Sequence, residues 1–317
     1  MRILRGNARL GTLPEDSGGE AWPPDLEQLQ PSSDEIWPER LERRSRPRPP
    51  RHFRRLELKY ILPERYLEHI LDWITPHTEV DPYLVKEGRG RTSYPVTSLY
   101  FDSYDLFCLD EKEAGRRFRR KIRLRSYEKE FAETVPCFME IKRRLDFVVL
   151  KDRIALPRGL LAAGVPMNRM LDYLLKNATE RDETWTEAVM MNSWFNLEPT
   201  AIVRYQRYAF ADSTDPSTRL TIDLDIEGSF KPPSLVGTVP LRSIDNLMAT
   251  GITGISGRFG ILELKCNHMI PWWFHAMVMD LELMRDAFSK YFLVVLGLRP
   301  QIYEDCDDRF QEAGWIG

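Results

Sequence analysis

The sequence predicts an α+β protein built on a mainly antiparallel sheet of about eight strands, with flanking helices. Segments that alternate apolar and polar residues with a period of two recur along the chain, which is the pattern of half-buried strands. They lie at 55–62, 96–102, 121–127, 137–143, 148–156, 201–210, 219–226 and 260–265. Helical stretches lie between several of them, and no internal repeat is visible. An antiparallel sheet of this size can close into a barrel.

The helices are predicted from apolar residues at helical spacing. Residues 64–74 follow Pro63, and proline is favoured at the start of a helix. Residues 160–176 are expected to be helical in part, and 183–195 have an amphipathic pattern. Residues 274–296 are predicted as the longest helix, which Gly297 and Pro300 end.

Composition excludes several classes of protein. The chain has 317 residues, 45 Lys+Arg against 48 Asp+Glu and a net charge of −3, whereas generic nucleic-acid binders carry a basic excess. The longest apolar run, 291–298, is too short to span a membrane, and the N-terminus has no apolar signal-peptide core. The four cysteines show no CxxC spacing, so we expect no zinc site or disulfide framework and a cytoplasmic location.

The first 51 residues differ in amino-acid composition and pattern from the rest of the chain. Residues 43–51 read RRSRPRPPR, and proline removes hydrogen-bond donors and restricts φ. We therefore predict a mostly disordered, Pro- and Arg-rich tail at 1–51 and one folded domain at 52–317.

Long cationic side chains share one face of several predicted strands, because residues i and i+2 of a strand point the same way. Lys121, Arg123 and Arg125 therefore point to one side. Ile122 and Leu124, between them, point to the other side. The same alternation puts together Glu57 with Lys59, Glu140 with Lys142, Lys151 with Arg153, Arg204 with Gln206, Arg219 with Asp223 and Asp225, and Glu263 with Lys265.

Two geometries satisfy this pattern. The polar faces either look outward over a sandwich core or line a closed barrel whose aliphatic outer wall is covered by helices. A cationic lumen needs an anion, because like charges in a low dielectric repel by several kcal/mol. Many Arg and Lys with a few carboxylates indicate a polyphosphate-like ligand, and the carboxylates suit Mg²⁺ or Mn²⁺. Asp223 and Asp225 are either ligands or ion-pair partners of Arg219.

Nine motifs in chain order resemble the VTC domain, the polyphosphate polymerase domain of the vacuolar transporter chaperone complex and its bacterial relatives. They are LELKY (56–60), SLYFD (98–102), KIRLR (121–125), MEIK (139–142), LKDR (150–153), VRYQR (203–207), RLTID (219–223), LELK (262–265) and FSKY (288–291). The family is one of the triphosphate tunnel (CYTH-like) enzymes, and the resemblance spans about 52–300. It implies a closed eight-stranded antiparallel barrel, in which the γ-phosphate of ATP is transferred onto polyphosphate with the help of Mn²⁺ or Mg²⁺.

The resemblance also implies roles for individual residues. Lys59 in LELKY resembles the lysine suggested to activate the attacking phosphate. Arg123 and Arg125 in KIRLR resemble the arginines that bind the phosphates at the catalytic centre of the family. Glu263 in LELK matches the metal-binding glutamate. The other implied phosphate contacts are Lys121, Lys142, Lys151, Arg153, Arg204, Arg219 and Lys290. Hydrolytic relatives carry ExExK on the first strand, but the leading position here is Arg55, which fits the VTC branch.

Three alternatives remain open from the sequence. The same tunnel could bind polyphosphate or triphosphate without turning it over, or it could be an inorganic triphosphatase. The segment 115–125 is rich in arginine and contains Phe118, which could stack on an RNA base. Because 121–125 alternate as a strand, we expect no nucleic acid as a partner. The resemblance implies ATP and polyphosphate or triphosphate as partners. Any membrane partner is expected to be a separate polypeptide.

Overall fold

The computed structural model describes residues 56–81, 84, 92–145, 148–161, 165–178, 181–237, 239–244, 257–267, 269–285 and 289–299. They all belong to the unit of the chain that begins at Arg55. The tail predicted at 1–51 lies outside the described residues.

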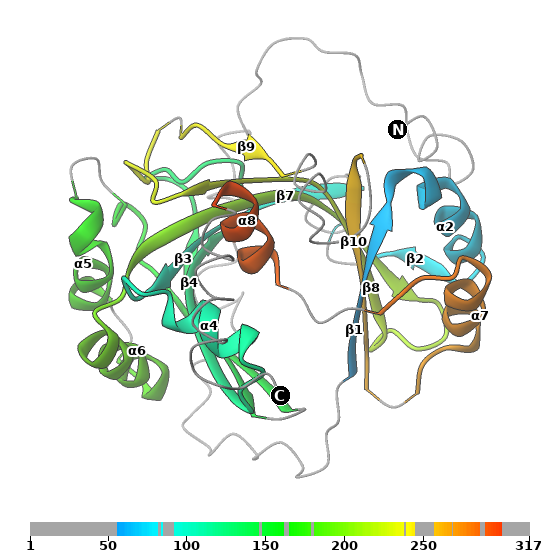
Figure 1. Ribbon diagram of the computed structural model, residues 1–317, viewed down its shortest axis with the longest axis horizontal. Coiled ribbons are helices and arrows are strands. Elements are labelled where there is room, and N and C mark those ends of the chain that lie inside the picture. Colours follow the sequence, from blue (N-terminus) through cyan, green and yellow to red (C-terminus); the bar gives the residue numbers. More distant parts are fainter. Residues whose placement is uncertain are drawn as a thin grey trace, which may run out of the picture. The chain divides into compact units, whose positions relative to one another are not determined.

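One antiparallel sheet forms the framework of this unit, which confirms the α+β prediction (Figure 1). Its main path runs through β1 (Leu56–Pro63), β10 (Phe259–Cys266), β8 (Arg219–Phe230), β7 (Glu198–Asp212), β3 (Ser93–Asp102), β4 (Phe118–Ser126), β5 (Cys137–Leu145) and β6 (Val148–Ala155). These strands correspond to the alternating segments of the sequence. Two short strands lie off this path, since β2 (Thr78–Val80) pairs with β7 and β9 (Arg242–Ser243) pairs with β8.

The prediction of a closed eight-stranded barrel is not confirmed. The sheet has 10 strands, and no ladder joins β1 to β6 in the part of the chain that the structure describes. Side chains link the two arms of the sheet instead, because Lys142 Nζ on β5 lies 3.1 Å from Glu57 Oε2 on β1. A contact between long charged side chains therefore links the two arms of the sheet, where a closed barrel would have main-chain hydrogen bonds between β1 and β6.

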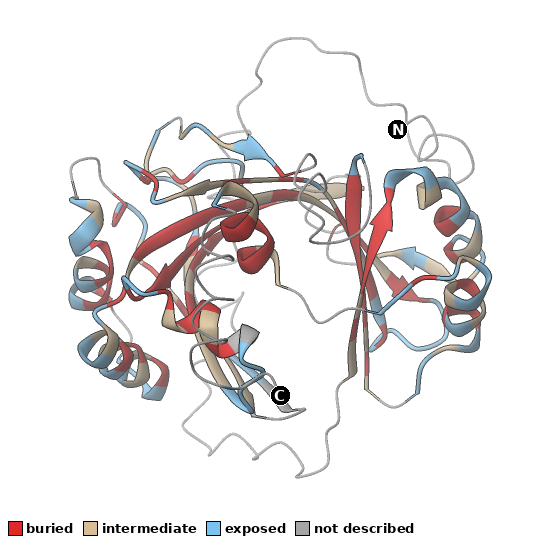
Figure 2. Cartoon of the chain, viewed as in Figure 1, coloured by how far each residue is buried: buried red, intermediate tan, exposed pale blue. Residues whose placement is uncertain are grey.

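Helices cover the outer face of the sheet (Figure 2). The helices α5 (Met170–Asn177) and α6 (Glu183–Phe195) pack with the apolar side chains of β3 to β6. The helix α2 (Leu67–Ile74), which follows the 3₁₀ turn η2 (Glu64–Tyr66), lies beside α7 (Trp272–Asp280) near β1, and the rings of Tyr60 and Phe274 are 5.7 Å apart. A second 3₁₀ turn, η3 (Met167–Arg169), precedes α5. None of the described helices is long and apolar enough to cross a membrane.

The helix predicted at 274–296 is wrong, because two helices occupy this stretch. The first, α7, ends at Asp280, and Glu282 adopts a left-handed φ of 49°, which a continuing helix does not allow. The second, α8, comprises Lys290–Leu298. Ser289 is its N-cap, because the Ser289 side chain accepts a hydrogen bond from Phe292 N. The helix predicted at 183–195 is confirmed as α6. Of the described residues in 160–176, those of η3 and α5 are helical.

The opposite face of the sheet carries α8, and we call it the inner face. Apolar residues such as Val203 and Tyr205 pack there against α8, and α4 (Phe107–Glu113) adds Leu109. A side chain at Gly228 would collide with Val294 of α8, so only glycine allows this close approach of helix and strand. The helix therefore fills one end of the inner face and leaves the rest to charged side chains.

Candidate functional site

Charged side chains line the inner face beyond α8. They alternate with apolar residues, which lie on the outer face under the helices. Of the two geometries that the sequence left open, the structure shows the one in which the charged side chains face inward. The cations are Lys59, Lys121, Arg123, Arg125, Lys142, Lys151, Arg153, Arg207, Lys265 and, from α8, Lys290. The carboxylates are Glu57, Glu140, Asp223 and Glu263. The cations outnumber the carboxylates, so the inner face attracts anions.

The first charged cluster is centred on Glu140, whose side chain is fully buried. Its Oε2 lies 2.8 Å from Arg123 Nη2 and 3.7 Å from Arg125 Nε, and its Oε1 lies 2.6 Å from Lys151 Nζ. Burial by itself raises the pKa of Glu140, but the three cations outweigh burial and lower this pKa to about 2. Burial also lowers the pKa of Lys151 to about 8, against the pull of Glu140.

The second cluster is centred on Asp223, which is also fully buried. Arg207 binds both of its oxygens, with Nε 2.7 Å from Oδ1 and Nη2 2.8 Å from Oδ2. Lys290 Nζ lies 2.6 Å from Oδ2. Both cations also lie over the ring of Tyr205, at 5.2 and 4.8 Å from its centroid. Burial opposes ionisation of Asp223, but the two cations keep its pKa below its usual range.

The third cluster joins β1, β10 and β5. Lys265 Nζ lies 3.2 Å from Glu263 Oε1, and Lys59 is paired with Glu263 in the β1–β10 ladder. Burial raises the pKa of Glu263, but Lys265 and Lys59 hold it well below its usual range. Burial and the neighbouring Lys59 lower the pKa of Lys142 to about 8, although Glu57 opposes this. The second and third clusters are neighbours, because Lys290 and Arg207 of the second act electrostatically on Glu263 of the third.

The structure brings most of the predicted site residues together on the inner face. Lys121 Nζ donates to Ser289 Oγ at 3.2 Å, which links β4 to the start of α8. Arg153 lies over the ring of Phe138 at 4.8 Å and is exposed. Arg219 is half-exposed and pairs with Asp81 at 3.2 Å, so it lies at the margin of the site.

Arg204 is not brought to the inner face, contrary to its predicted phosphate contact. Its Nη2 lies 2.6 Å from Glu227 Oε2 on the outer face of β7 and β8. Arg207, in the same motif, supplies the inner-face guanidinium and was missed by the sequence analysis. The signal was present, because Val203, Tyr205 and Arg207 share one side of the strand.

Asp223 and Asp225 have different partners in the structure, and Arg219 forms its ion pair with Asp81. Asp225 lies 2.5 Å from Arg258 Nη2 and has an exposed side chain, so it is a surface ion-pair partner. Asp223 is the buried anchor of Arg207 and Lys290.

Glu263 can supply one carboxylate to a metal ion. No group of three or more His, Cys, Asp or Glu side chains is arranged for a metal among the described residues. Mg²⁺ is commonly held by one or two carboxylates together with phosphate oxygens and water. The low pKa of Glu263 keeps it ionised, and Glu57 lies close enough to influence Glu263 electrostatically. This donor set therefore fits a metal that arrives with a phosphate ligand.

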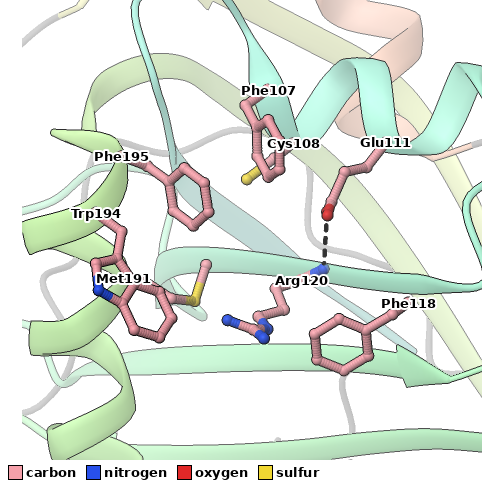
Figure 3. Close-up of a pocket in the computed structure, with 8 residues that line it drawn as sticks. All are labelled: Phe107, Cys108, Glu111, Phe118, Arg120, Met191, Trp194 and Phe195. Carbon is pink, nitrogen blue, oxygen red and sulfur yellow. Dashed lines mark hydrogen bonds between the residues drawn. The ribbon is translucent and has the colours of Figure 1, made fainter.

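A cavity of about 210 Å³ lies between α4, α6 and the start of β4 (Figure 3). Its lining is mostly apolar and aromatic. Phe118 lies there under the guanidinium of Arg120, 4.3 Å from its ring centroid. The main-chain N–H of Arg120 donates to Glu111 Oε2 at 3.2 Å. Because these contacts occupy Phe118 and Arg120, they weaken the case for RNA stacking on the segment 115–125.

The fold and the inner face together define an antiparallel sheet with an excess of cationic side chains on one face. The sequence model of the VTC domain matches residues 54–297, and the chain belongs to the VTC domain family.

Two solved structures show weak likeness to this chain. The PH1819 protein from Pyrococcus horikoshii OT3 has a TM-score of 0.36 and 10% identity, and the match covers 77% of this chain and 99% of that one. The Mimivirus capping enzyme triphosphatase has a TM-score of 0.28 and 9% identity, over 72% of this chain and 88% of that one. No curated protein matches the chain at a significant level. The family assignment therefore rests on the sequence model.

Proposed function

We propose that this chain is a polyphosphate polymerase-type phosphotransferase that moves the γ-phosphate of ATP onto a polyphosphate chain bound at the inner face. The observation that carries the proposal is the set of guanidinium and ammonium groups that converge on the buried carboxylates of Glu140 and Asp223. Membership of the VTC domain family supports it.

Phosphoryl transfer depends on positioning and charge stabilisation, because the migrating group is metaphosphate-like and its charge is spread over its oxygens. Arg123, Arg125 and Lys151 would hold one part of the phosphate chain. Arg207 and Lys290 would hold another part. Arginine binds phosphate oxygens with a fixed fork of donors, and lysine binds them as a point charge.

Two further residues have proposed roles. Lys59 would stabilise the attacking acceptor phosphate, since it lies beside Glu263 on the inner face. Glu263 would hold Mn²⁺ or Mg²⁺, which when bound neutralises phosphate charge as a Lewis acid.

The test is incubation of the full chain with ATP and Mn²⁺, followed by measurement of ADP and of an acid-precipitable phosphate chain. Arg123→Ala is expected to lower kcat/KM about 30- to 1000-fold, because it removes a donor to the transferred charge. The exposed Arg158→Ala variant is the control and is expected to retain wild-type activity. Unchanged turnover and polyphosphate binding in Arg123→Ala would contradict the site.

The same assay separates the two rival functions. A binding module would retain polyphosphate but form no ADP. An inorganic triphosphatase would release orthophosphate from tripolyphosphate without extending a chain. The presence of Arg55 in place of the first glutamate of ExExK favours the polymerase over the triphosphatase.

Anion affinity is expected to fall as the pH rises above about 8, because Lys142 and Lys151 have pKa values of about 8. Both are charged below that pH and attract phosphate, and both become neutral above it. Tripolyphosphate affinity, measured by calorimetry at constant ionic strength, should therefore drop by up to about tenfold per pH unit for each lysine. The double variant Lys142→Arg/Lys151→Arg should flatten this dependence, because arginine stays protonated. Wild-type affinity that is unchanged up to pH 9.5 would contradict the assignment of these lysines.

A further inference from the structure

We propose that Tyr100 is the proton acceptor of this site and removes the proton from the terminal phosphate hydroxyl of the acceptor chain. The inference rests on the proposed function and adds a catalytic residue to it. Neither the alternation of charges nor the motif roles point to this tyrosine.

The position of Tyr100 places its hydroxyl beside a phosphate clamp. Arg123 Nη1 donates to Tyr100 Oη at 3.1 Å, and Arg123 Nε donates to Glu140 Oε2 at 2.8 Å. One guanidinium therefore holds both the tyrosine and the anion of the first cluster. A phosphate that takes the place of Glu140 on Arg123 would bind the same guanidinium as the phenol oxygen, through the Nε and Nη2 donors, while Nη1 keeps its bond to Tyr100.

The groups that face Tyr100 favour its phenolate. From β4, the cations Lys121, Arg123 and Arg125 act on it. From α8, the ring of Tyr291 stacks on it with centroids 5.0 Å apart. Among the described residues, three further titratable groups contact these neighbours: Asp102 bonds to Tyr291, Glu140 to Arg123 and Tyr205 to Arg125.

The hydroxyl of Tyr291 donates a hydrogen bond to Asp102 Oδ2 at 2.7 Å. The tyrosine that stacks on Tyr100 is thus held in place through its own hydrogen bond. Burial raises the pKa of Tyr100, but Arg123, Arg125 and Lys121 outweigh burial and bring this pKa to about 7. A general base is most effective when its pKa lies near the working pH.

The proposed step balances in atoms and electrons. The phenolate of Tyr100 takes the proton of the acceptor P–O–H group, and the oxygen so freed forms a bond to the γ-phosphorus of ATP. The bond between that phosphorus and the bridging oxygen of ADP breaks, and ADP leaves with the electron pair. The proton on Tyr100 then passes to water, which restores the phenolate.

The kinetic test compares wild-type protein with Tyr100→Phe, which keeps the ring that stacks on Tyr291 and removes only the hydroxyl. We expect kcat to fall about 10²- to 10⁴-fold, with KM for ATP changed less than about threefold. The rise of kcat with pH, centred near 7 in the wild type, should disappear in the variant. A tyrosine that only positions Arg123 would instead raise KM and leave the pH profile unchanged, and that result would overturn the proposal.

A second readout does not depend on activity. The ultraviolet absorbance of tyrosinate should show one tyrosine that titrates near pH 7 in the wild type and in Tyr104→Phe, whose side chain is exposed, but not in Tyr100→Phe. Absence of this titration in the folded wild type would overturn the proposal even if the enzyme is active. If the titration is present but ATP yields no chain product, the proposed function fails and the proton-transfer role fails with it.

Discussion

The Glu140→Gln variant is expected to unfold more easily than the wild type by about 3–5 kcal/mol, because the ion cluster loses its buried central anion. Glu140 is fully buried and contacts Arg123 and Lys151 directly, with Arg125 next to it. The amide keeps the shape of the side chain but removes the carboxylate charge that these cations share. Urea denaturation in buffer free of phosphate and sulfate measures the difference.

The ion pairs of Glu140 with its neighbouring cations should also make the stability of the wild type depend on pH. The folded-state pKa of Glu140 is about 2 against an ordinary value of 4.5, so its stabilisation is present above pH 4.5 and is lost as the pH falls towards 2. Glu133→Gln is the matched control, because Glu133 is exposed, and it should change stability by less than about 0.5 kcal/mol. Added tripolyphosphate should stabilise Glu140→Gln more than the wild type. Equal stability of the two Gln variants would refute the cluster.

The Arg207→Ala variant is expected to weaken tripolyphosphate binding about 30- to 1000-fold, because a buried, charge-assisted pair loses one member. Arg207 binds both oxygens of Asp223, and after its loss the remaining cation against that carboxylate among the described residues is Lys290. The variant should also unfold more easily by about 2–4 kcal/mol. Calorimetric titration and urea denaturation measure the two effects separately.

Arg204→Ala is the control for Arg207→Ala, three residues away in the same strand. Its guanidinium pairs with Glu227 on the outer face, where both side chains are partly exposed. A pair of this kind contributes about 0–1 kcal/mol, and tripolyphosphate affinity should change less than about twofold. Equal losses of affinity in both variants would show that the faces of β7 are assigned wrongly. Arg207→Lys should retain part of the binding, because the charge remains and the second donor is lost.

The sheet and its charged face could be predicted from the sequence because strand alternation is a local property. KIRLR places cations and aliphatic residues on opposite sides wherever the strand lies in the sheet. The helix α6 was predicted to the residue, and Asp182 caps it by accepting a hydrogen bond from Trp185 N. These features depend on a few adjacent residues and are therefore visible in the sequence.

Other features depend on contacts between distant segments. The break between α7 and α8 was missed because the apolar spacing continues through it, whereas Glu282 adopts a conformation that only the tertiary structure reveals. Arg204 was assigned from the motif VRYQR, which contains two arginines, and the structure shows that the second of them, Arg207, is the one on the inner face. Barrel closure was not predictable, since it depends on how the arms that carry Glu57 and Lys142 approach each other.

The carboxylates among the inner-face cations have a consequence for selectivity. Glu57, Glu140, Asp223 and Glu263 already occupy the ammonium and guanidinium groups, so an incoming anion must exchange with a built-in competitor. A monovalent ion such as chloride or acetate cannot outcompete several tethered carboxylates at once. An occupant that presents many charges along one backbone can do so, and we therefore expect the protein to select anions by their number of charges.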